Sequence, residues 1–370
     1  MRKNDSAIRL VIGALGCLAT LVVAAKAPAI GQFAPPDRTR FEVVAESGKP
    51  EIPFERINNH VVVPLSINGS KEFQLVLDTG MPASGVVLYG DERIEALDLD
   101  YAPIQAQVGG AGGEGQTIQA QIALEEELRL PGLEMHDARV MVLDTPEGFG
   151  DYHDGIVGYS LFQRWVVEID NDESVIRLHE SEGFEPPQGA HELPLTLRGN
   201  MPFVEVDVAV ESGERFPAEV VVDLGAAHVL SLNTDESEQI VIPDGAIEAR
   251  LGHGLSGPID GKIGRVAEVD LGGYVLKQVV TSFPVREHQD PRGLDSLAGN
   301  LGNGALQRFT TIFDYANERM LLVPGDEADE PFVWDQSGIE FAFGSDDLRV
   351  ERVLPGSPAA RAGLKADDIV

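Results

Sequence analysis

Two aspartates stand in matching segments of this 370-residue sequence, and their setting suits acid–base chemistry. Asp78 lies in the segment 75–80, Leu-Val-Leu-Asp-Thr-Gly, and Asp223 lies in the segment 220–225, Val-Val-Val-Asp-Leu-Gly. Burying a carboxylate after an apolar strand is costly unless it is hydrogen-bonded or shares a proton. Two such groups side by side would titrate as a pair, with one protonated and one ionised. The ionised group could activate water, and the protonated one could polarise a carbonyl and assist a leaving nitrogen.

The repetition of the motif, rather than either copy, carries this interpretation. A lone Asp-Gly is common turn chemistry. Here the segment 155–164, Gly-Ile-Val-Gly-Tyr-Ser-Leu-Phe-Gln-Arg, also returns 144 residues later as 299–308, Gly-Asn-Leu-Gly-Asn-Gly-Ala-Leu-Gln-Arg. Asp170 and Asp314 are again 144 residues apart, against 145 for the two motif aspartates. The sequence therefore predicts one structural unit of about 140 residues that occurs twice.

β-structure must position both aspartates. Each copy ends in two short apolar strands joined by turn residues, a pattern typical of a hairpin. We expect one β lobe over 51–185 and a second over 186–325.

Glycine-rich stretches lie between the landmarks of each copy. We expect 109–115 in the first copy to be a hairpin that covers a cleft. The stretch 252–264 in the second copy suits a hairpin and a long surface loop equally well.

These motifs resemble a known family. Asp78-Thr79-Gly80, Ser84 and the segment 155–158 are similar to a lobe of the retropepsin-like and pepsin-like aspartic proteases, and the two copies cover about 50–325. The resemblance implies an all-β fold of two pseudo-symmetric barrel lobes, with Asp78 and Asp223 as catalytic residues. It also implies supporting roles for Thr79, Gly80, Leu224 and Gly225 in the two loops, and for Ile156, Val157, Gly158, Leu301 and Gly302 in the segments beneath them.

The second copy departs from the family pattern at Leu224, where the family has a Thr or Ser hydroxyl that interlocks the loops. Asn300 is a further departure, at a position that is apolar in the family. The leading hypothesis is an endopeptidase that cleaves extended peptides between the lobes. The alternative is a peptide-binding protein that kept the fold without catalysis. A generic all-β interaction domain ranks third, because it would make the paired motifs a coincidence.

Other polar residues are better explained without chemistry. We interpret His228 as a loop histidine and Asp154 as a turn residue. His153 and Asp151 lack the companions of a metal site, so we expect no metal and no cofactor. Ser160 and Ser231 lack the context of a nucleophile.

Composition excludes several classes of function. The 61 acidic and 28 basic residues give a formal net charge of -33, which disfavours nucleic acid and anionic lipid as partners. The 40 Gly and 23 Pro favour tight turns and short strands. Cys17 is the one cysteine, so internal disulfides and thiol chemistry are excluded. Because both halves of the site lie in one chain, we expect a monomer.

The N-terminus predicts export. Arg2, Lys3 and Arg9 flank an apolar run over 10–25, which is short for a membrane span and suited to a signal peptide. We expect 1–25 to be a signal peptide or an N-terminal anchor and 26–50 a linker, which places the protein in the periplasm or outside the cell. Lipidation at Cys17 is a lesser alternative.

The C-terminal stretch 348–364 resembles the first half of a PDZ domain, with a specific Gly-Ser-Pro-Ala-Ala run. Val350 and Val353 suit a strand, Ser357 a helix start and Gly363 its end. We expect 332–370 to be a truncated PDZ-like segment after an acidic linker.

Overall fold

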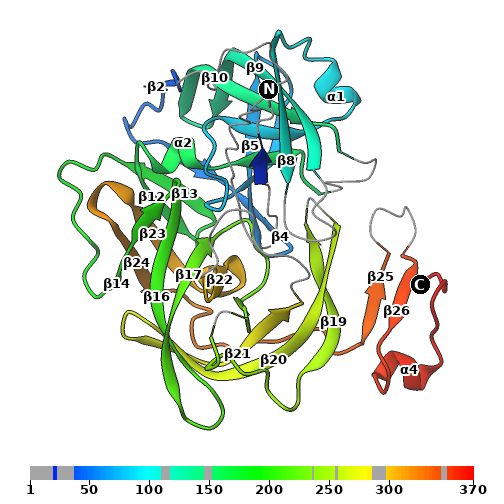
Figure 1. Ribbon diagram of the computed structural model, residues 1–370. Helices are drawn as coiled ribbons and strands as arrows, with labels where there is room; N and C mark the ends of the chain where they lie inside the picture. Colours follow the sequence, from blue (N-terminus) through cyan, green and yellow to red (C-terminus); the bar gives the residue numbers. More distant parts are fainter. Residues whose placement is uncertain are drawn as a thin grey trace, which may run out of the picture.

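The chain folds into two β lobes, a sheet that joins them and a small C-terminal segment (Figure 1). The computed structural model describes residues 20–22, 37–109, 117–145, 152–235, 237–254, 257–285, 297–342 and 348–370. Residues 1–19 and 23–36, which carry most of the predicted export signal and linker, the lipidation candidate Cys17 included, lie outside this part.

The first lobe is a mixed sheet in the order β4-β5-β6-β11-β7-β10-β9-β8, closed into a barrel because β5 also pairs with β9. Its elements are β4 (Glu55–Ile57), β5 (His60–Ile67), β6 (Phe73–Leu77), β7 (Val86–Tyr89), α1 (Glu92–Glu95), β8 (Tyr101–Gly109), β9 (Thr117–Leu130), β10 (Leu133–Leu143), β11 (Gly155–Val157) and α2 (Tyr159–Phe162). Strands β6, β7 and β11 are short, apolar and almost wholly buried, as expected for strands covered on both faces.

The second lobe repeats this order strand for strand, as β15-β16-β17-β22-β18-β21-β20-β19 with β16 also pairing with β20. Its elements are β15 (Thr196–Arg198), β16 (Met201–Ala209), β17 (Arg215–Asp223), β18 (Leu230–Leu232), β19 (Ile247–Gly254), β20 (Gly257–Leu271), β21 (Tyr274–Pro284), β22 (Gly299–Gly302) and α3 (Asn303–Leu306). The predicted all-β class with two pseudo-symmetric lobes is confirmed.

A six-stranded sheet in the order β14-β24-β23-β12-β13-β3 joins the lobes. Its elements are β3 (Glu51–Pro53), β12 (Val166–Asp170), β13 (Val175–His179), β14 (His191–Pro194), β23 (Phe309–Asp314), η1 (Tyr315–Asn317) and β24 (Arg319–Pro324). At its centre β12 and β23 pair through Val167 with Phe313, Glu168 with Ile312 and Ile169 with Thr311. Exchanging the copies by their 144-residue offset maps these pairs onto themselves. The pseudo-twofold axis therefore passes between Glu168 and Ile312.

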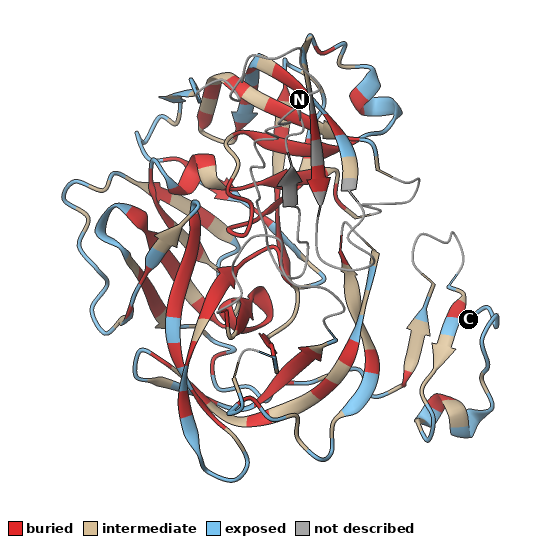
Figure 2. Cartoon of the chain, in the orientation of Figure 1, coloured by how far each residue is buried: buried red, intermediate tan, exposed pale blue. Residues whose placement is uncertain are grey.

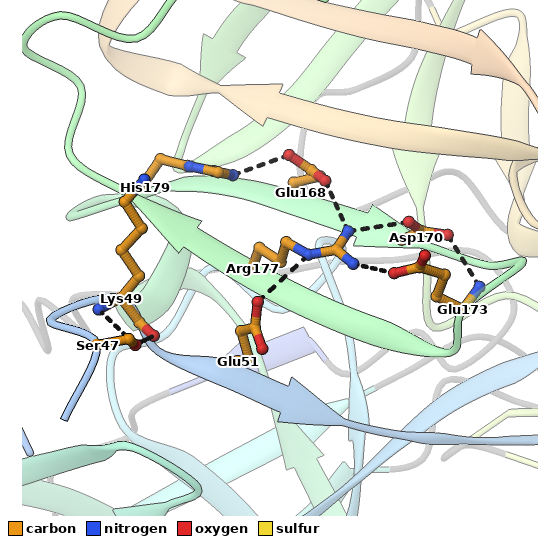
Figure 3. A network of polar contacts seen from close by, with 8 residues as sticks. All are labelled: Ser47, Lys49, Glu51, Glu168, Asp170, Glu173, Arg177 and His179. Carbon is orange, nitrogen blue, oxygen red and sulfur yellow. Dashed lines mark hydrogen bonds and ion pairs between the residues drawn. The ribbon is translucent and has the colours of Figure 1, made fainter. Parts of the chain in front are cut away.

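Arg177 of β13 forms ion pairs with the two strands that flank β13 in this sheet (Figure 3). Its guanidinium lies 2.9 Å from both Glu168 and Asp170 of β12 and 3.6 Å from Glu51 of β3. The hydrogen bond from His179 and the contact with Arg177 lower the pKa of Glu168. Partly buried ion pairs of this kind are screened by salt less than exposed ones.

One buried apolar cluster extends through both lobes and the joining sheet. Phe162 of α2 and Phe313 of β23 meet edge to face across the copies, with ring centroids 5.3 Å apart. Figure 2 shows the buried residues concentrated in the lobes and the sheet, whereas the C-terminal segment is mostly intermediate or exposed. The strands β6 and β17, which lead into the two aspartate loops, are therefore part of the packed core.

Part of the expected N-terminal spacer belongs to the first lobe instead. Residues Arg40–Val43 form β2, which pairs antiparallel with β10. Phe41 and Val43 alternate with polar residues and pack against the core, so this stretch has the period of a half-buried strand. Thr20–Val22 form β1, which pairs with β8. Among the described residues there is no helix long and apolar enough to cross a membrane.

The C-terminal segment consists of the antiparallel pair β25 (Ile339–Phe341) and β26 (Val350–Val353) followed by α4 (Pro358–Ala362). The predicted helix start and end are confirmed, because the Ser357 hydroxyl accepts from the Ala360 N–H at 3.1 Å and Gly363 has φ 89°. The backbone N–H of Arg250 on β19 donates to Glu340 at 2.8 Å, which links the segment to the second lobe.

Candidate active site

Asp78 and Asp223 stand at equivalent points of the two lobes. Asp78 directly follows β6, and Asp223 is the last residue of β17. The parallel neighbour of β6 is β11, and that of β17 is β22, the strands that hold the predicted supporting segments. The Asp78 N–H donates to Val157 O at 2.8 Å. Each aspartate is thus placed by a pair of parallel strands that are buried where they reach it.

The two carboxyl groups are buried and adjacent, with 1% of Asp78 and 0% of Asp223 exposed. Asp78 Oδ1 accepts from the Gly80 N–H at 2.7 Å, and Asp223 Oδ2 accepts from Asn300 Nδ2 at 2.8 Å. The remaining oxygens, Asp78 Oδ2 and Asp223 Oδ1, are also buried and have no well-formed hydrogen bond to another described residue, although the two carboxyls interact with each other and with the Gly225 N–H. Each carboxyl therefore keeps one oxygen for a proton or a bound reactant.

Burial and mutual repulsion set the protonation of the pair. Burial raises the pKa of Asp78 to about 6, although the Gly80 N–H partly opposes it. Burial and then the charge of Asp78 raise the pKa of Asp223 well above its ordinary value. Asp78 is therefore the group that ionises first, and Asp223 is the one that keeps a proton.

Thr79 interlocks the two aspartate loops from one side. Its hydroxyl donates to Val222 O at 2.7 Å and accepts from the Leu224 N–H at 3.0 Å. Leu224 is 1% exposed, and its apolar side chain cannot form the equivalent hydrogen bonds to the first loop. The interlock that the family resemblance implies is therefore present from the first loop only.

Close contacts explain the glycines of the motifs. A Cβ on Gly225 would lie 2.4 Å from the carboxyl carbon of Asp78, and a Cβ on Gly158 would lie 2.1 Å from Asp78 O. Gly302 similarly lies under the carbonyl oxygen of His228. Only glycine allows the two loops and the strands beneath them to approach so closely. Ile156, Val157 and Leu301 are buried in the same strands.

Two asparagines that the sequence analysis did not single out hold the loops across the lobes. Asn59 Nδ2 donates to Ala227 O at 2.9 Å, and Asn200 Nδ2 donates to Pro82 O at 3.0 Å. Both lie in two-residue hairpin turns with successive positive φ angles, 49° and 62° at Asn58 and Asn59. The signal available in the sequence was a turn pair ending in Asn, repeated 141 residues apart.

Two histidines make further polar contacts around the second loop. His60 Nε2 donates to Gly225 O at 3.0 Å. His228, interpreted from the sequence as a loop histidine, lies in the loop between β17 and β18, and its Nε2 is 3.0 Å from Asn300 Oδ1. Asn300 takes up the apolar position beneath Asp223 because a polar partner stands on either side of its amide. No sequence spacing connects His228 to Asn300, 72 residues away.

The other candidates have structural roles. Asp154 does more than form a turn, because it accepts from the Gln74 N–H at 2.7 Å and pairs with Arg93. Ser160 accepts from the Gly85 N–H at 2.6 Å. His153 is buried beside Tyr152, and burial lowers its pKa to about 4.

Three further residues noted in the sequence are Ser84, Ser231 and Asp151. Ser231 is buried in β18, and Ser84 hydrogen-bonds Asp37. Asp151 lies outside the described residues. Within the described part of the chain, no group of three potential metal ligands comes together.

Two hairpins project from the lobes at equivalent places. Strands β8 and β9 pair from Tyr101 to Gly109, and the tip of the expected covering hairpin, 110–116, lies outside the described residues. In the second lobe β19 and β20 pair up to Gly254 with Gly257, which decides between hairpin and loop in favour of the hairpin.

Comparisons with known proteins agree with this arrangement. Residues 63–161, which include the first motif and the strand beneath it, match the aspartyl protease family. The structure is similar to that of an aspartic proteinase from Irpex lacteus, with a TM-score of 0.50 and 12% identity over 76% of this chain and 99% of that one. At this identity the likeness shows the fold. No curated protein matches the sequence.

Proposed function

We propose that this chain, which has the aspartyl protease family motif in its first lobe and the fold of the aspartic proteinases, is an aspartic endopeptidase. One observation carries the proposal. Two buried carboxyl groups at equivalent strand ends interact with each other, each has one oxygen with no well-formed hydrogen bond to another described residue, and their environments separate their pKa values. Such separation is how one site supplies both an acid and a base.

In the proposed reaction Asp78 is the base and Asp223 the acid. Asp78 Oδ2 takes a proton from water, whose oxygen attacks the carbonyl carbon of the peptide bond. Asp223 Oδ1 gives its proton to the carbonyl oxygen, so a neutral tetrahedral diol forms. One diol hydroxyl then returns its proton to Asp223, Asp78 protonates the nitrogen and the C–N bond breaks. The products are a carboxylic acid and an amine, and both aspartates regain their starting states.

A non-catalytic peptide-binding protein is the second candidate, and Leu224 is the observation that favours it. Loss of one half of the interlock would leave the loops less firmly positioned, and small misplacements reduce rates strongly. The retained Thr79 bonds, together with those from Asn59 and Asn200, support the enzyme instead.

The test is peptide-library cleavage from pH 3 to 8 by the full chain, beside Asp78→Asn and Asp223→Asn. The endopeptidase requires that the parent cleaves and that both folded variants lose at least about 1,000-fold in kcat/KM. A parent that binds peptides but cleaves none at any pH would establish the second candidate.

We also propose that the protein acts outside the cytoplasm as a monomer on peptides or proteins. The basic residues and apolar run at 1–25 support export, and the presence of both aspartates in one chain supports the monomer. Fusing 1–50 to a reporter that is active only after export tests the first statement, and sedimentation of the purified chain tests the second. A PDZ-like role in substrate recruitment for 332–370 stays a proposal that rests on sequence resemblance.

A further inference from the structure

Asn300 lies between a histidine and the second aspartate. Its Nδ2 is 2.8 Å from Asp223 Oδ2, and its Oδ1 is 3.0 Å from His228 Nε2. Asn300 and Asp223 are both 0% exposed. The three side chains come from β22, from the loop after β17 and from the end of β17, so the fold itself brings them together.

Both hydrogen bonds of the Asn300 amide have a defined direction in the structure. The amide nitrogen donates to Asp223 Oδ2. The amide oxygen then faces His228 and can only accept, so His228 carries its proton on Nε2. Burial lowers the pKa of His228 to about 4, which keeps the ring neutral above that pH. A half-turn of the amide would require the Asp223 proton on Oδ2 and the His228 proton on Nδ1, so the orientation of the amide and the position of the Asp223 proton are linked.

The first lobe has no such arrangement. Ile156 is the counterpart of Asn300 at the 144-residue offset, and its side chain cannot form a hydrogen bond. Asp78 depends on the Gly80 N–H for its bound oxygen. The side-chain relay is thus found in the lobe whose own loop hydroxyl is replaced by Leu224.

We infer that His228 and Asn300 form a positioning relay that orients the Asp223 carboxyl and restricts its proton to Oδ1, the oxygen that would act on a substrate carbonyl. The inference rests on the proposed function for its consequence but not for its geometry. With Oδ2 already accepting the amide N–H, Oδ1 is the remaining place for the proton. The relay thereby assigns the acid role to one atom of the pair.

Other titratable groups face the relay and enter its pH behaviour. Asp78 acts on Asp223 directly, and His60, whose Nε2 holds Gly225 O, repels a proton on His228. Variants of the relay must therefore be compared at pH values where these groups keep the same charge.

The first experiment does not depend on activity. Aspartate carboxyl carbons are labelled with ¹³C and titrated by NMR in the parent and in Asn300→Leu, with Asp223→Asn to assign the signals. Removal of the amide donor should move the Asp223 transition to higher pH, because the amide favours the ionised carboxylate. His228→Leu should move it in the same direction, whereas His228→Gln, which keeps a donor in this place, should restore the parent titration.

The second experiment measures kcat and KM separately. Asn300→Leu should lower kcat by about 10- to 100-fold with a smaller change in KM, as expected for a misplaced acid. Asn233→Leu is the matched control, because Asn233 is another buried asparagine of the second lobe whose amide bonds a backbone carbonyl, Leu297 O, rather than the dyad.

The outcomes separate this inference from the proposed function. An Asp223 titration that is unchanged in Asn300→Leu overturns the relay, whatever the activity. A shifted titration in a parent that cleaves no peptide supports the relay and contradicts the endopeptidase. Equal losses of kcat in Asn300→Leu and Asn233→Leu also overturn it, because the effect is then one of stability.

Discussion

Asn59 and Asn200 are counterparts under the pseudo-twofold axis, and each donates its side-chain amide to the loop that follows the aspartate of the opposite lobe. Their acceptors, Ala227 O and Pro82 O, are themselves counterparts. The hairpin turns of the two lobes thus hold the two loops reciprocally, although only one loop hydroxyl does so. This reciprocal contact keeps the dyad symmetric where the motif residues are not.

Loss of either cross-lobe bond should weaken catalysis more than folding. Asn59→Gly and Asn200→Gly keep the positive φ that the turns require and remove only the amide. We expect each to lower kcat about tenfold, with a cost in the free energy of unfolding of about 1 kcal/mol. Asn68→Gly is the control, since Asn68 also has positive φ but bonds Glu126 within its own lobe. Equal kinetic constants for all three variants would contradict a catalytic role of the cross-lobe hydrogen bonds.

The hydroxyl of Thr79 should contribute more to stability and activity than the volume of its side chain. Thr79→Val removes both bonds of the interlock while keeping the shape, so Val222 O and the Leu224 N–H lose their partner in a buried place. We expect about 2–4 kcal/mol less stability and at least a 100-fold loss of kcat/KM. Thr79→Ser keeps the hydroxyl and should stay within a few-fold of the parent, as urea unfolding and peptide kinetics can show.

Gly225→Ala should inactivate the protein. The new Cβ would lie 2.4 Å from the Asp78 carboxyl carbon, so Asp78 or the loop must move. We expect kcat to fall at least 100-fold even in molecules that remain folded. Gly245→Ala provides the control, because a Cβ there meets nothing within 4 Å. Near-parental activity in Gly225→Ala would show that the two loops are further apart than described.

Peptide cleavage should be strongest near neutral pH. The proposed reaction needs Asp78 ionised and Asp223 protonated, and burial raises the pKa of Asp78 to about 6. Below that pH the ionised base becomes rarer by about tenfold per pH unit, so kcat/KM should fall with that slope. A pH–rate profile from pH 3 to 8 checks this, and a maximum near pH 3 would contradict the assignment of charges.

The dyad should make stability depend on pH in a defined direction. A carboxyl whose pKa is raised in the folded state stabilises fully below its unfolded value and loses that contribution as pH rises through the folded value. For Asp78 the change from 3.8 to about 6 corresponds to roughly 3 kcal/mol.

The matched comparison uses Asp78→Asn, which cannot ionise at this position. The difference in the free energy of unfolding between parent and Asp78→Asn should decrease from pH 4 to pH 7. His153, whose lowered pKa makes stability fall as pH drops from 6.5 towards 4, contributes equally to both proteins and cancels. If urea titrations show no change in this free-energy difference between pH 4 and pH 7, the raised pKa of Asp78 is contradicted.

The duplicated motif made the lobes and the position of the dyad predictable from the sequence. The hairpin that ends each copy and the approach of Asp78 to Asp223 follow from repeat offsets of 144 and 145 residues, which agree within one residue. Strand β2 escaped notice because it is four residues long, and only pairing with β10 shows that it belongs to the lobe.

The polar residues around the second loop could not be predicted in the same way. Asn300 departs from the apolar pattern, and its two hydrogen-bond partners, which explain the departure, cannot be identified from the sequence. His228 and Asn300 meet only because β22 runs beneath the loop after β17, a three-dimensional fact with no local signature. Direction of donation, likewise, depends on the side chains that surround each amide.

The β12–β23 pairing on the axis has a consequence for how this chain can evolve. In a symmetric dimer of identical subunits every mutation changes both halves of the site together. Here the halves are encoded separately, so Asn300 can differ from Ile156, His60 from Met201 and Leu224 from Thr79 while the scaffold remains symmetric. Covalent duplication therefore lets the surroundings of Asp78 and Asp223 change independently, and genetic drift in one half need not be copied into the other.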